Sequence, residues 1–335
     1  MQRADSSSRL KFFSALGGSI VVLGLAVAWV AKALGKLPAE SWDLHPNFAL
    51  IVCALMLVPI NYGLETYKWH RLMGWGDWRD RTKEVLFGVS WSLVGPLRMG
   101  AMIGRIAAAP SVVRNQAVRA FASSSIAQGI ATAAGASTAL CFIDFRGSPA
   151  AASPLIAWGI TLALIGIYLG WSPQFWERLG QYRSLKSWGE SRQISLDLRL
   201  QALGISALRY LVFLCQFILL LEAFHHAGIA RLHGLGKNGI GLAERLFDNG
   251  ISASLTWGIS SVIPSPLLAD LGVREAVALE VFTMSEVGDP LSVVMAGLAL
   301  WTMNLLLPAL IGTTWHGLNR ASGTNRTNGT NDRRT

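Results

Sequence analysis

The chain has 335 residues, of which 52% are hydrophobic and only 15% charged, and its formal net charge is +9. This balance lies outside the range of soluble globular domains and indicates an integral membrane protein. The basic residues are dispersed between apolar stretches and form no nucleic-acid-reading motif, which excludes nucleic acid as the expected partner. Cys53, Cys141 and Cys215 lie far apart without a histidine pair nearby, so neither a disulfide framework, a metal site nor a cofactor is expected.

Six apolar stretches are long enough to cross about 30 Å of hydrocarbon, which takes about 20 helical residues. In chain order they are 12–34, 47–68, 117–142, 153–171, 201–224 and 289–313. The first follows a basic N-tail, 1–11, and its length favours a retained span over a removed signal peptide. The polar C-tail, 318–335, is predicted to be disordered. The sequence therefore predicts an all-α integral membrane protein with about six transmembrane helices.

Two further hydrophobic stretches, 85–106 and 250–282, are interrupted by proline and glycine. The interruptions contain Pro96, Arg98, Gly100, Gly104 and Arg105 in the first, and Pro264, Pro266, Gly272 and Arg274 in the second. Backbone that leaves a helix at membrane depth is tolerated where protein covers it or water reaches it, so such breaks indicate a cavity. Each half of these stretches is too short to cross, which favours two re-entrant helical hairpins.

The order of these elements predicts an inverted repeat. With the N-terminus inside, the cytoplasmic segments hold 21 of the 29 Lys and Arg residues, which favours an N-in, C-in topology. In both 12–142 and 153–313 the elements then follow in the order span, span, hairpin, span. The second half begins on the opposite side of the membrane from the first. Paired breaks in inverted halves are typical of a transporter's substrate site. The alternative is coincidence in an ordinary helical bundle.

Four arginines are the candidates for binding a phosphate-bearing group. Arg98 and Arg105 flank the first break, Arg274 follows the second, and Arg209 lies within a span. Ionisable residues at membrane depth are costly and usually functional, and the arginine fork suits phosphate. The residues expected to line or support the cavity are Glu65, Pro96, Gly100, Gly104, Gln128, Gln216, Gly272 and Asn304. The alternatives are structural, namely an ion pair of Glu65 with Arg105 or Lys68, and amides that join helices by hydrogen bonds.

Several of these segments, taken in order, resemble the lysylphosphatidylglycerol synthase transmembrane-region family of flippase-like proteins. The resemblance covers about residues 47–313. Its segments are Asn61, Gly63, Leu64, Glu65, Lys68 and Trp69; Pro96, Arg98, Gly100, Gly104 and Arg105; Ser125 and Gln128; Arg209, Tyr210, Phe213 and Gln216; Pro264, Leu271, Gly272, Val273 and Arg274; and Trp301, Asn304, Pro308 and Gly312. It implies the lipid-handling membrane part without the soluble aminoacyl-transferase domain.

The sequence departs from that family at Ala101, where relatives carry Glu after the glycine, and at Asp270, where Glu is expected. The resemblance implies a lipid transporter of the bacterial cytoplasmic membrane that binds and translocates an anionic or aminoacylated lipid. Its partners would be this phospholipid or lipid-linked substrate, the bilayer, and a second copy or a lipid-modifying enzyme. One alternative is a membrane-embedded transferase that uses Glu65, Asp270 or Glu275 as acid or base; another is a non-transporting scaffold.

Overall fold

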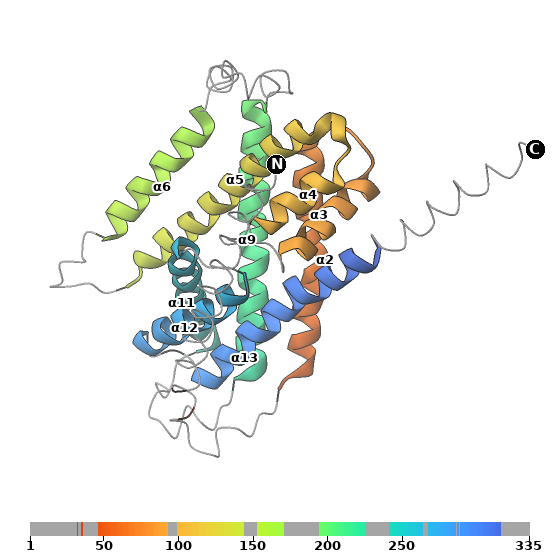
Figure 1. Cartoon of the computed structure of the whole chain (residues 1–335). Coiled ribbons are helices and arrows are strands. Elements are labelled where there is room, and N and C mark those ends of the chain that lie inside the picture. Colours follow the sequence, from red (N-terminus) through yellow and green to blue (C-terminus); the bar gives the residue numbers. More distant parts are fainter. Residues whose placement is uncertain are drawn as a thin grey trace, which may run out of the picture.

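A computed structural model describes residues 46–92, 99–143, 153–170, 194–225, 241–263, 267–285, 287 and 289–315, together with Lys32 and Gly35. Over these residues the protein is all-helical and has no strand. The helices are α2 (Phe48–Met73), α3 (Trp78–Ser92), α4 (Gly100–Ala108), α5 (Arg114–Leu140), α6 (Ser153–Gly170), α9 (Leu196–Phe224), α11 (Leu242–Val262), α12 (Leu267–Met284) and α13 (Pro290–Trp301) (Figure 1). A 3-10 turn, Ser111–Val113, precedes α5, and a π-helix, Thr302–Leu306, continues α13 into a helix that ends at Trp315.

Side-chain caps explain where several helices begin. The Asn47 side chain accepts a hydrogen bond from Ala49 N at the start of α2, and Ser195 Oγ accepts one from Leu198 N at the start of α9. Asp289 caps α13 in the same way, with Pro290 in the first turn. Such caps satisfy backbone N–H groups that have no partner within the helix. At the other end of α2, Gly74 adopts a left-handed conformation (φ 72°) that ends the helix.

Four helices are long and apolar enough to cross a membrane: α2, α6, α9 and the helix Pro290–Trp315. They coincide with the predicted spans 47–68, 153–171, 201–224 and 289–313, so these four predictions are confirmed at the level of helix and composition. The predicted span 117–142 lies in α5, which has 27 residues but is rich in Ala, Ser, Thr and Gly and is not among the four. The predicted span 12–34 and both tails, 1–11 and 318–335, lie outside the described residues.

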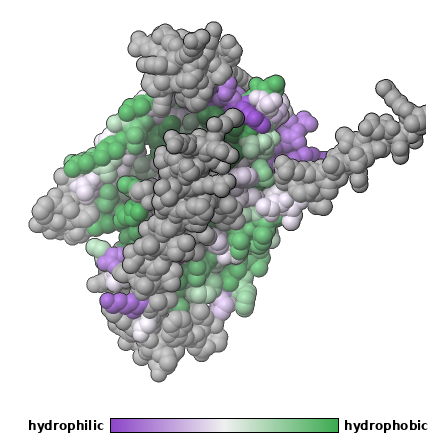
Figure 2. All heavy atoms as spheres, in the orientation of Figure 1, coloured by the Kyte–Doolittle hydropathy of each residue, from purple (hydrophilic) through white to green (hydrophobic). Residues whose placement is uncertain are grey.

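The surface of α6 is apolar and open. Leu155, Ile156, Leu162 and Ile167 on this helix are 79%, 60%, 59% and 62% exposed. Figure 2 shows the hydrophobic surface over α6 and hydrophilic residues toward the edges of the molecule. An exposed apolar surface of this extent is costly in water and favourable against lipid tails. The composition and this surface together support a membrane protein.

The interior is organised around α2 and α9, which lie side by side at the centre of the molecule (Figure 1). α3 packs against α4, and α11 packs against α12, so each interrupted stretch is a pair of neighbouring helices. α5 packs against α11. The helix that ends at Trp315 packs against α3, where Ser90 Oγ donates a hydrogen bond of 2.7 Å to Ala309 O.

The second interrupted stretch is longer than expected. α11 has 21 residues and begins at Leu242, eight residues before the predicted start of the hairpin at 250, and α12 has 18 residues. At about 1.5 Å per residue, α11 alone is about 30 Å long. Its first two turns carry the polar residues Glu244, Arg245, Asp248 and Asn249. This helix is not among the four that are apolar enough to cross a membrane.

Glycines set the distance between α3 and α4. A Cβ atom on Gly100 would lie 2.1 Å from Trp91 O, and one on Gly104 would lie 2.8 Å from the Cα of Gly88. Because both contacts are with backbone atoms, a side chain at either position cannot be accommodated by a rotamer change of a neighbour. Gly100 and Gly104, expected to line the cavity, are therefore packing residues of the first helix pair. Pro96 and Arg98 lie outside the described residues.

Replacing Gly100 by Ala is expected to destabilise the protein by about 1–3 kcal/mol, because the new methyl group overlaps the backbone of Trp91. The measurement is the thermal unfolding midpoint of the purified protein in detergent. The control is Gly204→Ala in α9, where a Cβ atom meets nothing within 4 Å. A midpoint for Gly100→Ala as high as that of the control would contradict the close helix contact.

Candidate functional site

A buried cluster of one acid and three bases joins α2, α4 and α9. Glu65 in α2 is 4% exposed, and Lys68, one turn later, is 1% exposed. Glu65 Oε2 lies 3.1 Å from Lys68 Nζ and also pairs with Arg209 Nη1, while Glu65 Oε1 lies 2.7 Å from Arg105 Nη1. Lys68 Nζ also donates to Ser206 Oγ on α9 at 3.0 Å. Three positive side chains thus share one carboxylate.

Aromatic rings hold Arg105 in place. Its guanidinium carbon lies 5.2 Å from the centre of the Trp69 ring and 5.6 Å from that of Phe121, within the range of a cation–π contact. The Trp69 indole N–H in turn donates a hydrogen bond of 2.7 Å to Glu84 Oε2. The same oxygen accepts a hydrogen bond of 2.6 Å from Arg81 Nη1. Burial raises the pKa of the Glu84 carboxyl, and these two partners oppose that rise. Arg105 is thereby fixed toward Glu65.

Arg209 connects the charged cluster to a chain of amides. Its Nε donates to Asn61 Oδ1 at 3.0 Å, and its Nη1 donates to Gln128 Oε1 at 3.2 Å. Asn61 Nδ2 donates to Asn304 Oδ1 at 3.1 Å, and Asn304 Nδ2 donates to Gln216 Oε1 at 3.2 Å. Amide hydrogen bonds of this kind join helices within a membrane. Here they fix the Arg209 guanidinium between α2, α5 and the C-terminal helix.

Asn304 lies in the π-helix Thr302–Leu306. Its backbone oxygen also accepts a hydrogen bond from the Tyr62 hydroxyl of α2. A π-turn inserts one residue into a helix and is common at functional sites, because it frees a carbonyl and redirects side chains. The insertion places both the side chain and the carbonyl of Asn304 toward α2.

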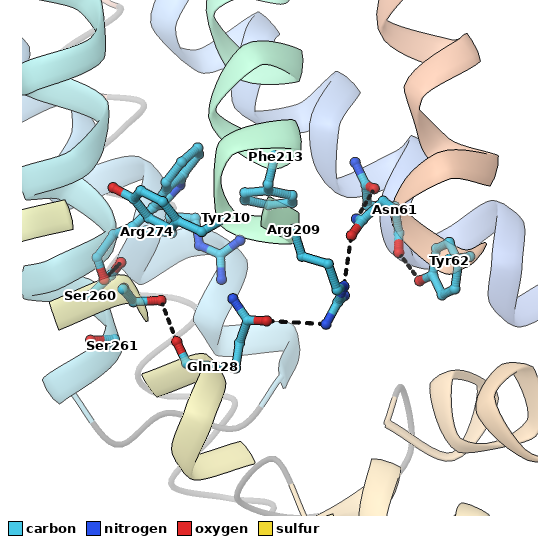
Figure 3. A pocket seen from close by; sticks show the side chains of 12 residues that line it. Asn61, Tyr62, Gln128, Arg209, Tyr210, Phe213, Ser260, Ser261 and Arg274 are labelled. Carbon is cyan, nitrogen blue, oxygen red and sulfur yellow. Dashed lines mark hydrogen bonds between the residues drawn. The ribbon is translucent and has the colours of Figure 1, made fainter. Parts of the chain in front are cut away.

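Beside this network lies a cavity of about 270 Å³. Its wall includes Arg209 of α9 and Arg274 of α12, which reach it from different helices (Figure 3). The remaining lining is partly aromatic and partly polar: Tyr62, Tyr210, Phe213 and Trp257; Asn61, Gln128, Thr132, Ser260, Ser261 and Asn304. Phe213, Phe217 and Tyr210 surround the Trp257 ring, with ring centres 4.7, 5.6 and 5.9 Å away. The cavity wall therefore combines aromatic rings, polar side chains and two arginines.

The predicted site residues divide into three groups. Arg209, Arg274, Gln128 and Asn304 line the cavity, whereas Glu65, Arg105 and Gln216 form the network behind it. Gly100 and Gly104 pack α4 against α3, and Gly272 is buried in α12. Both alternatives foreseen for Glu65, an ion pair with Arg105 and one with Lys68, are present together.

Trp257, Ser260 and Ser261 were not expected at the site. They lie within one turn of each other in α11, where two hydroxyls follow a tryptophan in an apolar run. That spacing is the one signal in the sequence that could have indicated them. Among the described residues, no three His, Cys, Asp or Glu side chains lie close enough to hold a metal ion.

Replacing Glu65 by Gln is expected to destabilise the protein by about 3–5 kcal/mol, since three buried cations lose their counter-charge. The measurement is the thermal midpoint in detergent, with Glu244→Gln, an exposed acid in α11, as the matched control. Adding Lys68→Met to Glu65→Gln removes one of the stranded charges and should restore part of the loss. Equal midpoints for wild type and Glu65→Gln would show that the cluster contributes nothing to stability.

No protein-family model, no curated protein and no solved structure matches the chain.

Proposed function

We propose that this protein binds a lipid through a phosphate-bearing headgroup, anionic or aminoacylated, and translocates it across the bacterial cytoplasmic membrane. The observation that carries the proposal is the surplus of positive charge beside the cavity. Within the described residues Lys68, Arg105 and Arg209 have Glu65 as their common acidic partner, so three positive charges face one negative charge. A bound anion would balance this surplus.

Arginine is suited to that role. Its planar group donates paired hydrogen bonds to phosphate oxygens, and charge-assisted hydrogen bonds are stronger than neutral ones in a medium that excludes water. Arg209 already directs its Nε and Nη1 atoms to Asn61 and Gln128, and Arg274 brings a further positive charge to the cavity wall. The phosphate would lie between these two arginines.

The size of the cavity favours a headgroup over a whole lipid. About 270 Å³ is near the lower limit of ordinary ligand pockets, which begin at about 300 Å³. A phosphate and a short polar group fit in such a space, whereas two acyl chains do not. The chains would remain in the bilayer, along apolar surfaces such as that of α6.

The packing of the helix pairs supports an inverted repeat as the basis of translocation. α5 packs against α11 of the second pair, and its counterpart in the repeat, the helix Pro290–Trp315, packs against α3 of the first pair. In this scheme the helix hairpin of residues 85–106 enters the membrane from the cytoplasm, and the hairpin of residues 250–282 enters from the opposite side. Both termini are then cytoplasmic. The resemblance to the lysylphosphatidylglycerol synthase transmembrane-region family implies the same function.

Replacing Arg274 by Gln is expected to weaken binding of phosphatidylglycerol by about 10- to 100-fold, which corresponds to the loss of one or two hydrogen bonds to a charged group. Arg274→Lys should retain part of the affinity, because it keeps the charge without the fork. The assay uses protein in liposomes with a fluorescent phosphatidylglycerol, and it measures both binding and movement between leaflets.

The matched control is Arg245→Gln. Arg245 does not line the cavity, and its Nη2 atom lies 2.8 Å from Glu222 Oε2. Equal transport by wild type and Arg274→Gln would contradict the proposed site. Mass spectrometry of the same liposomes tests the other class of function, because a new covalent lipid species would indicate a transferase.

A further inference from the structure

A second carboxyl group lies deep in the protein beside the cavity. Glu275 follows Arg274 in α12 and is 4% exposed. No hydrogen-bond partner for its Oε2 atom is found among the described residues. An ionised carboxylate without partners is very costly away from water, so this group has a strong tendency to hold a proton.

The space around the Glu275 carboxyl group is too small for a ligand larger than a water molecule. Glu275 lines a separate small cavity of about 10 Å³. On the opposite wall, a Cβ atom on Gly297 would lie only 2.0 Å from Glu275 Oε1, so the carboxyl group rests directly on the backbone of α13. A space of this size admits at most about one water molecule. An ammonium headgroup or a metal ion with its oxygen ligands does not fit, and a proton does.

Arg274 links the two cavities. It lines the large cavity with Arg209 and the small one with Glu275. The other described residues around the small cavity carry no ionisable group: Phe217 of α9, Thr256 and Trp257 of α11, Ala278 of α12, and Gly297, Leu300 and Trp301 on the C-terminal helix. Arg274 is thus the one charged side chain among these that acts on Glu275.

We propose that Glu275 takes up a proton when an anionic headgroup binds at Arg274, and that it releases this proton when the headgroup leaves. In the empty protein, the positive charge of Arg274 stabilises the Glu275 carboxylate. A bound phosphate neutralises that charge, and the carboxylate then binds a proton from the aqueous phase at a carboxyl oxygen. Binding of the anion and of the proton are therefore linked, which would couple transport to a proton gradient. This inference rests on the function proposed above.

The coupling is tested by isothermal titration calorimetry of the purified full-length protein in detergent. The ligand is a short-chain phosphatidylglycerol, whose phosphodiester stays ionised across the pH series. Titrations in two buffers of different ionisation enthalpy give the number of protons bound with the lipid. For wild type, proton uptake should appear toward the alkaline end, where the resting carboxyl is ionised. The affinity should fall there with rising pH, by up to about tenfold per pH unit.

Glu275→Gln mimics the protonated group and should bind the lipid with no proton uptake and an affinity independent of pH. Glu280→Gln, which changes an exposed acid of the same helix, should behave as wild type. Lipid binding by wild type without proton uptake would overturn the coupling and leave the proposed function standing. The same uptake in Glu275→Gln as in wild type would also overturn it. No lipid binding by wild type would overturn both proposals.

Discussion

The carboxylate of Glu65 allows three basic side chains from three helices to meet in the interior of this protein. Each of these cations would be costly to bury alone, and their mutual repulsion would separate α2, α4 and α9. With Glu65 present, Lys68, Arg105 and Arg209 approach within hydrogen-bonding distance of one acid. The orientation of Arg209 then fixes Asn61 and Gln128, and through Asn61 the position of Asn304. The positions of several residues that line the cavity therefore depend on Glu65.

Glu65 and Glu275, the two buried acids beside the cavity, have opposite environments. Glu65 has more positive charge around it than it can neutralise, whereas Glu275 shares its small cavity with Arg274 as the other charged residue. The first acid holds a permanent structure together, because removing its charge leaves several cations unpaired. The second is balanced by a cation that is also exposed to the larger cavity, so its charge responds to what that cavity contains.

The sequence predicts the helices better than it predicts the site. Long apolar runs specify α2, α6 and α9, because a single segment can satisfy all its backbone hydrogen bonds in a bilayer by folding as a helix. The spacing of Glu65 and Lys68 also predicts their contact, since residues three apart share a helix face. The contact between Glu65 and Arg209 joins residues 144 positions apart and depends on how α2 packs against α9. No local pattern encodes that distance.

Other features of the site have weak signals in the sequence. In the sequence, Gly100 and Gly104 give the same signal whether they face a cavity or a neighbouring helix. In the structure, the backbone of α3 occupies the space beside both. The π-turn at Asn304 depends on one inserted residue, which leaves the apolar composition of the helix unchanged. The position of Trp257 against Tyr210 and Phe213 likewise follows from helix packing alone.

The C-terminal helix touches both helix pairs through glycines. Gly297 rests against the carboxyl group of Glu275 in α12, and Gly312 lies so close to α3 that a Cβ atom there would be 2.4 Å from Leu86 O. The π-turn lies between these two contacts. A continuous helix is stiff along its axis, so this helix transmits a displacement between the α3–α4 pair and the α11–α12 pair. A displacement of α12 against Gly297 would therefore also act on α3 through Gly312, so the two helix pairs are mechanically connected.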